Sequence, residues 1–130
     1  MRESFALQLA VHEVQQRDNR YAPESYAFLC QALGHTVKML ERENEDDRHV
    51  NGRELLSGFR DLAVLEFGPM AAFVIRDWGL ERSEDVGNMV YNLIGVGYFG
   101  RNETDSIDDF SDGVDLMEAL RRPFQVARRR

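Results

Sequence analysis

The sequence is poor in the residues that cross-link a fold. Cys30 is its one cysteine, so no internal disulfide can form, which fits a reducing cytoplasm. Its three histidines stand far apart, so a zinc site would have to gather ligands from scattered positions. No run of eighteen apolar residues occurs, and we therefore expect no membrane-spanning helix. The N-terminal stretch has an acid at Glu3 and no small-residue cleavage site, so we expect no secretory signal.

Positive charge is also scarce. Lys38 is the only lysine among 16 lysine and arginine residues, which stand against 23 acidic residues and leave a net charge of −7. Phosphates repel such a chain unless its basic residues cluster, so the composition disfavours nucleic acid as a partner. The arginines cluster in segment 121–130, which contains five of them. We predict an arginine-rich C-terminal tail there, either solvated and mobile or acting as a basic arm toward a partner, the protein's own acidic surface included.

The chain does contain helical periodicity, in segments separated by start and stop signals. Segments 3–17 and 23–40 carry apolar residues at helical spacing, and Pro23 stands at the first position of the second helix. Residues 41–48 are all polar and predict an exposed connector. The first helix carries apolar residues on two sides, which gives it a wider apolar surface than one buried face requires.

Segment 49–99 holds three further helix patterns. Asn51 and Glu54 have the spacing of a capping box, in which each side chain accepts a hydrogen bond from the other residue's backbone. Gly68 and Pro69 then predict the end of that helix and the start of a shorter one.

The third pattern in this segment is the clearest. Ser83 is predicted as the N-cap, and the acids that follow it occupy the first turn, where the helix dipole favours them. Apolar residues recur at i, i+3, i+4, i+7 and i+8 over 86–94, so one face of this helix is predicted to be buried.

Residues 98–110 allow two interpretations. The turn-forming residues 102–105, between short apolar stretches, predict a β-hairpin, which would give a winged-helix-like layout with 83–97 as the recognition helix. Residues 104–120 can instead form an amphipathic helix. The predicted fold class is mainly α: a compact single-domain bundle of five or six helices over residues 1–120, with the short hairpin as a variant at its C-terminal end.

Seven acidic residues between positions 103 and 118 have no basic residue among them. Like charges this close repel one another, so the segment is predicted first to be a solvated acidic face. Binding of a basic partner or of the arginine-rich segment is the second interpretation, and binding of a metal ion is the third. The calcium-loop pattern fails, because alignment on Gly113 places Phe110 and Ala119 where oxygen ligands are needed. The candidates for a carboxylate metal site are Asp105, Asp108, Asp109 and Asp112.

Polar residues opposite the apolar stripe of helix 83–97 are predicted to lie on its outward face. In a winged helix they would meet base edges, although the two acids at the helix start argue against DNA. Hydrogen bonds to a neighbouring helix or to another subunit are the alternative. The interaction candidates are Asn88, Tyr91, Asn92, Arg82 and Arg101.

Four motifs in combination, FGPM at 67–70, WG at 78–79, EDVG at 84–87 and VYNLI at 90–94, resemble the pattern of a small bacterial protein family. The resemblance covers about residues 5–115 and implies a bacterial, cytoplasmic, single-domain protein. That family has no established activity, so the resemblance implies no catalytic residue.

No catalytic set can be assembled from the sequence, and we expect no catalytic residue and no cofactor. The preferred hypothesis is a non-enzymatic protein-interaction or regulatory module that acts through helix faces or self-association. The reason is that the first helix has more apolar surface than one buried face requires, and a partner could cover the excess. The alternatives are a winged-helix-like nucleic-acid-binding protein and a carboxylate-based metal-binding protein or enzyme. The expected partner is a protein, a second copy of the chain included.

Overall fold

The computed structural model describes residues 4–42, 49–100 and 107–126. These residues form α-helices joined by turns, with no β-strand among them, so the mainly helical fold is confirmed. None of the described helices has the length and apolar character that crossing a membrane requires. The elements are α1 (Phe5–Arg17), α2 (Pro23–Met39), α3 (Gly52–Phe67), the 3-10 turn η1 (Gly68–Met70), α4 (Ala71–Asp77), α5 (Ser83–Gly95), the 3-10 turn η2 (Ile107–Phe110), α6 (Leu116–Arg121) and the 3-10 turn η3 (Arg122–Phe124).

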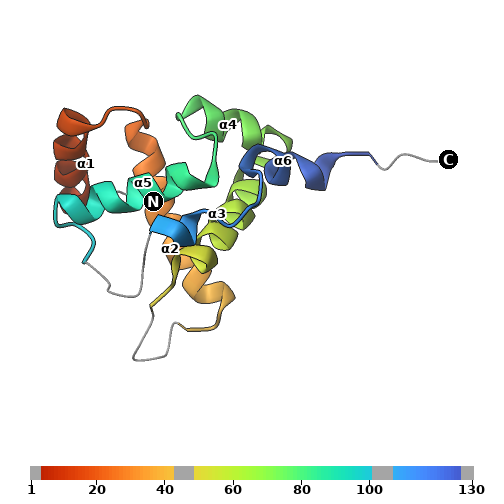
Figure 1. Cartoon of the computed structure of the whole chain (residues 1–130), viewed down its shortest axis with the longest axis horizontal. Coiled ribbons are helices and arrows are strands. Elements are labelled where there is room, and N and C mark those ends of the chain that lie inside the picture. The colour runs from red at the N-terminus through yellow and green to blue at the C-terminus, as the bar shows by residue number, and fades with distance from the viewer. Residues whose placement is uncertain (1–3, 43–48, 101–106, 127–130) are drawn as a thin grey trace.

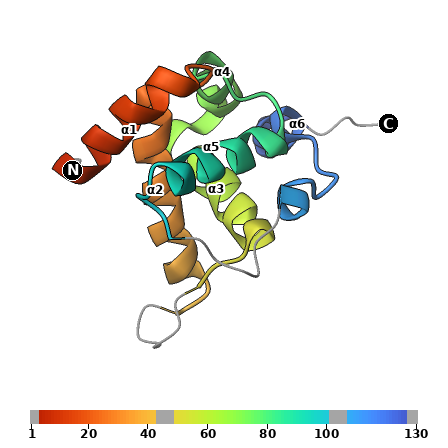
Figure 2. The same ribbon diagram turned by 60° about the vertical axis from the view of Figure 1, so that its left-hand side comes forward.

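The centre of the fold is the pair α2 and α3, which share the most extensive contact in the molecule. Helix α1 packs against α2 and α5, while α6 packs against α3 and α4 (Figure 1). In both views α1 and the C-terminal segment after α6 lie on opposite sides of the molecule (Figure 2). Buried apolar side chains from all six α-helices form one core cluster.

The predicted helix signals act as expected at several places. Asn51 accepts a hydrogen bond from the backbone N–H of Glu54, at 2.8 Å, and the Glu54 carboxylate accepts the backbone N–H of Asn51, at 3.1 Å. The capping box at the start of α3 is therefore confirmed. Pro23 is the first residue of α2, and Gly68 ends α3 at a φ of +56°, a left-handed value that glycine adopts without strain.

The β-hairpin wing is wrong within the described residues. Ile107–Phe110 forms the 3-10 turn η2 where the second strand was expected, and residues 101–106 lie outside the described residues. The single amphipathic helix that was the alternative over 104–120 is also wrong, because α6 (Leu116–Arg121) begins only at residue 116 and the described residues 107–115 before it are not α-helical. Gly113, at a φ of +79°, turns the chain between η2 and α6.

The side chain of Phe110 explains why η2 folds inward. Phe110 is 1% exposed and lies against two glycines, Gly52 at the start of α3 and Gly87 in α5. A Cβ atom added to Gly87 would come within 2.7 Å of the Phe110 ring, and one added to Gly52 would come within 3.1 Å. A hairpin strand exposed to solvent would give up this burial, so the ring holds the segment against α3 and α5.

The segment predicted as an arginine-rich tail begins inside regular structure. Arg121 is the last residue of α6, and η3 continues the chain to Phe124. Helical structure therefore extends past residue 120, while residues 127–130 lie outside the described residues.

Candidate functional site

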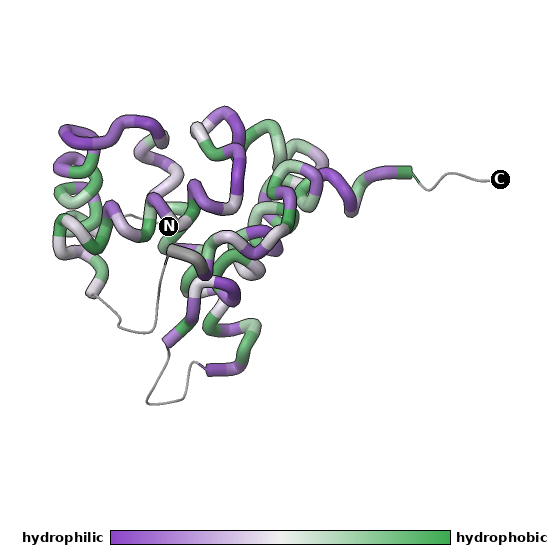
Figure 3. Tube along the Cα trace, viewed as in Figure 1, coloured by the Kyte–Doolittle hydropathy of each residue, from purple (hydrophilic) through white to green (hydrophobic). Residues whose placement is uncertain are grey.

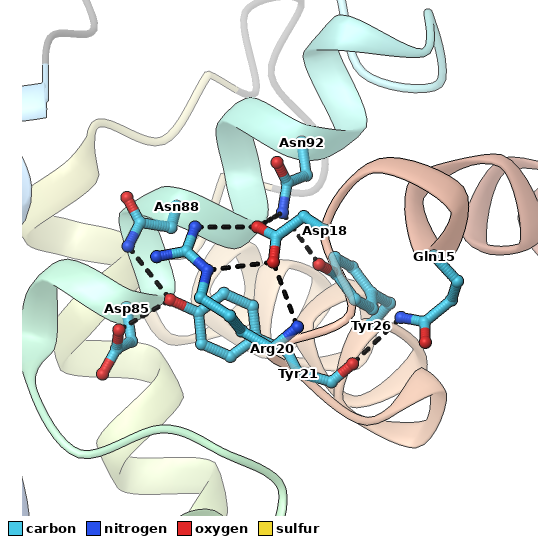
Figure 4. A network of polar contacts seen from close by, with 8 residues as sticks. All are labelled: Gln15, Asp18, Arg20, Tyr21, Tyr26, Asp85, Asn88 and Asn92. Carbon is cyan, nitrogen blue, oxygen red and sulfur yellow. Dashed lines mark hydrogen bonds and ion pairs between the residues drawn. The ribbon is translucent and has the colours of Figure 1, made fainter.

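The polar face of α5 meets the turn between α1 and α2. Asn88 donates from Nδ2 to the Tyr21 hydroxyl at 3.0 Å, and Asn92 donates to Asp18 Oδ2 at 2.9 Å and to the Tyr26 hydroxyl at 3.0 Å (Figure 4). The expectation that these asparagines face outward is wrong, because the α1–α2 turn covers this side of α5. The alternative, hydrogen bonding to a neighbouring element of the same chain, is what the structure shows.

Two buried tyrosines stand at the centre of this contact. Tyr21 and Tyr26 are 1% and 0% exposed, so their hydroxyl groups need partners inside the protein. Tyr21 donates to Asp85 Oδ1 at 2.6 Å while it accepts from Asn88. Burial, together with the neighbouring Asp85 carboxylate, raises the pKa of Tyr21 to about 12. The phenol therefore acts as a protonated donor and not as a base near neutral pH.

An ion pair closes the network at the end of α1. Arg20 donates from Nε to Asp18 Oδ1 at 2.9 Å and from Nη2 to Asp18 Oδ2 at 2.7 Å. These bonds from Arg20, with smaller help from Asn92, hold the pKa of Asp18 well below its usual range. Gln15 donates to the backbone oxygen of Tyr21 at 3.0 Å, which ties the last turn of α1 to the same point.

Asp85 joins the network to the start of α5. Burial alone would raise the pKa of Asp85, but the hydrogen bond from Tyr21 and those from two backbone N–H groups lower it below its usual value. Those N–H groups belong to Glu81 and Arg82, at 2.8 and 2.9 Å from Asp85 Oδ2. The predicted N-cap at Ser83 is wrong, since Arg82 holds that position and the Ser83 hydroxyl donates to the backbone oxygen of Val114 at 3.2 Å.

We call the eight residues that make these contacts the tyrosine–asparagine network. Their hydrogen bonds and ion pair join the α1–α2 turn to α5 within one chain. Both phenols are shielded from solvent, so a substrate could reach them only if the α1–α2 turn moved away from α5. The arrangement fixes helix positions and offers no accessible reacting group at the tyrosines. Its members are Gln15, Asp18, Arg20, Tyr21, Tyr26, Asp85, Asn88 and Asn92.

The shifted pKa of Asp18 predicts a dependence of stability on pH. A carboxyl group whose pKa is lower in the folded state stabilises the fold above its unfolded pKa of about 3.9, and this contribution declines progressively as the pH falls from that value toward the folded pKa. The urea midpoint of Asp18→Asn, measured from pH 6 to pH 2.5, should therefore fall less on acidification than that of the unchanged protein. Asp77→Asn, at an exposed position in α4, is the control and should follow the unchanged protein. Equal slopes for all three would contradict this role of Asp18.

The described acids of segment 103–118 do not gather around one point. Asp112 accepts from Arg60 Nη1 at 3.0 Å and from the backbone N–H of Val114 at 3.0 Å, and Asp115 caps α6. Asp109 lies beside Gly52 at the start of α3. Among the side chains that the structure describes, no three His, Cys, Asp or Glu residues lie where they could hold a metal ion. Asp105 and the side chain of Asp108 lie outside the described residues.

Of the remaining interaction candidates, the structure describes Arg82 and Tyr91. Arg82 is exposed at the start of α5, and Tyr91 is partly buried against the core. Arg101 lies outside the described residues. The bonds that Asn88 and Asn92 make to the α1–α2 turn also occupy the amide groups that a winged helix would turn toward base edges.

The structure adds a site that the sequence did not indicate, an apolar pocket of about 280 Å³ between α2, the start of α3 and the end of α5. Its volume lies near the lower end of the range for small-ligand pockets, roughly 300–1,000 Å³. We call it the α2–α3–α5 pocket. Its walls include Leu33, Val90, Ile94, Tyr98, Phe99 and Phe110.

Part of the network could have been found from the sequence. Asn88 and Asn92 are four residues apart, on the side of α5 opposite its apolar stripe, which predicts a shared polar partner. Their partners, Tyr21 and Tyr26, are more than sixty residues away, and no local signal selects them.

The chain was also compared with known proteins. No family model, no curated protein and no solved structure matches it. The resemblance to a small bacterial family through the motifs at 67–70, 78–79, 84–87 and 90–94 stays a prediction.

Proposed function

We propose that the protein is a non-enzymatic helical interaction module that associates with a second copy of itself through the outer face of α1. The observation that carries this proposal is the exposure of Phe5 and Leu9, at 73% and 55%. The two side chains are four residues apart, so they are neighbours on one face of the helix. The opposite face holds the buried residues of α1, Leu7, Ala10, Val11 and Val14.

The distribution of apolar residues around α1 supports this proposal. Figure 3 shows hydrophobic and hydrophilic residues alternating around the turns of this helix, which packs against α2 and α5. A phenylalanine and a leucine exposed side by side offer apolar surface that a partner can cover. The same face on a second copy is complementary by symmetry, as in most homodimers.

The placement of the titratable groups favours an interaction module over an enzyme. The carboxyl and phenol groups with shifted pKa values include Asp18, Tyr21, Tyr26 and Asp85, all of which serve the tyrosine–asparagine network. The single cysteine and the resemblance to a bacterial family support a place in the bacterial cytoplasm.

The test is the mass of the protein in solution, measured by light scattering on a size-exclusion column over a range of concentrations and salt. We expect the mass to rise toward that of a dimer with concentration and to do so at high salt as well, because screening by salt does not weaken an apolar contact. Leu9→Gln should shift the mass toward the monomer. Phe73→Gln, at a 65% exposed aromatic residue of α4, is the matched control and should leave the mass unchanged. A monomer at every concentration, or an equal effect of both variants, would refute the proposal.

A further inference from the structure

The α2–α3–α5 pocket is lined mainly by apolar side chains, so it suits an apolar group. Leu33, Ile94, Tyr98 and Phe99 form its sides and the buried ring of Phe110 contributes to its wall. The inner wall is closely packed, because the Phe110 ring lies against Gly52 and Gly87. A pocket of about 280 Å³ has room for an aromatic side chain and the backbone around it.

The overall charge of the protein favours a positively charged occupant. Near the pocket the charges are mixed, because Asp109 lies next to the lining residue Gly52 and Arg42 donates to the backbone oxygen of the lining residue His49. Segment 121–130 contributes five arginines and no acid to the net charge of −7. The remaining 120 residues therefore carry a net charge of −12. An apolar segment that carries basic residues would therefore be attracted to this protein before it is bound.

The chain itself contains such a segment. Residues 121–130 read RRPFQVARRR, in which an aromatic and an aliphatic side chain stand between arginines. Phe124 is 40% exposed and Val126 is 93% exposed, and the backbone between them is extended at Gln125. Figures 1 and 2 show this end of the described chain running away from the helices, and Figure 3 shows hydrophilic and hydrophobic residues along it.

We propose that the α2–α3–α5 pocket binds segment 121–130 of a second copy of the chain, with the Phe124 ring between its apolar walls and the arginines against the acidic surface. We assign the bound segment to a second copy for the following reason. Helix α6 packs on α3 and α4, and after η3 the chain runs outward from the molecule in both views, so a segment of the same copy points away from the helices. This goes beyond the proposed function, since no residue of α1 lines the pocket.

A fluorescently labelled peptide of residues 121–130, titrated with the full-length protein, tests this proposal by anisotropy. We expect saturable binding that weakens as salt is raised and that weakens about tenfold or more when the peptide carries Phe124→Ala, because one buried aromatic anchor carries much of such an interface. In the protein, Phe99→Ala and Ile94→Gln should weaken binding in the same way. Circular dichroism and the urea midpoint show that each variant is folded, and Phe73→Gln is the control outside the pocket.

The other outcomes each overturn the proposal. The proposal would be wrong if no saturable binding were found. It would also be wrong if salt abolished the binding while neither Phe124→Ala nor the pocket variants changed it, because the attraction would then be electrostatic and would not involve the pocket. The test is separable from that of the α1 face, because Leu9→Gln should leave peptide binding unchanged. A dimer that persists without peptide binding would reject the pocket alone, and peptide binding by a protein that never dimerises through α1 would reject the proposed α1 contact alone.

Discussion

Replacing Phe110 with alanine is expected to lower the free energy of unfolding by about 3–5 kcal/mol, as is usual when a fully buried phenylalanine is truncated. Phe110 is 1% exposed, and its ring lies against Gly52 of α3 and Gly87 of α5. The glycines Gly52 and Gly87 lie against its ring and have no side chains that could move into the space it leaves. The cavity would therefore stay open, and the segment before α6 would lose its apolar contact with α3 and α5. Urea denaturation followed by circular dichroism measures the change.

Phe73→Ala serves as the matched control for this prediction. Phe73 is 65% exposed on α4, so its truncation should change the free energy of unfolding by no more than about 0.5 kcal/mol. If the two variants were equally stable, Phe110 would not hold η2 in place. Gly87→Ala is expected to destabilise the protein as well, because its Cβ atom would meet the Phe110 ring at 2.7–2.9 Å.

Phe110 also shows why the sequence did not predict the segment in which it lies. The turn residues 102–105 and the apolar positions around them are compatible with a hairpin and with a helix, because both patterns are local. The decision depends on a contact with Gly52 and Gly87, residues that the sequence presents only as a helix start and a position within a helix. Helices whose ends carry their own signals, such as the capping box of Asn51 and Glu54, were predicted correctly.

For the candidate site too, features that depend on neighbouring residues were predicted, whereas contacts between distant parts of the chain were not. The polar face of α5 was recognised, but its direction was not, since Asn92 bonds to Asp18 and Tyr26, residues of another part of the chain. Ser83 was assigned to the N-cap by its residue type, yet its hydroxyl serves Val114. A polar side chain has several possible partners, and packing rather than spacing selects among them.

Gly58→Ala is expected to destabilise the protein through the contact between α2 and α3. An added Cβ atom would meet the Thr36 hydroxyl and lie 2.8 Å from Thr36 Cβ and 3.3 Å from Thr36 Cα, in the most extensive helix contact of the fold. Overpacking of this kind costs about 1–3 kcal/mol and more where the backbone must move, which exceeds the gain of about 1 kcal/mol from replacing a helical glycine. The unfolding free energy should therefore fall. Gly34→Ala is the control, because nothing lies within 4 Å of its Cβ position in α2, and it should be neutral or stabilising.

A double-mutant cycle identifies the colliding residue. Thr36→Gly alone should destabilise α2, because it removes a buried side chain whose hydroxyl donates to the backbone oxygen of Ala32 at 2.7 Å. In combination with Gly58→Ala it should cost less than the sum of the two single changes, since the new methyl group would then occupy the space that Thr36 vacates. The coupling between them is expected at about 0.5–3 kcal/mol, the range for residues in contact. Additive effects would mean that α2 and α3 approach each other for a reason other than the fit of Thr36 against Gly58.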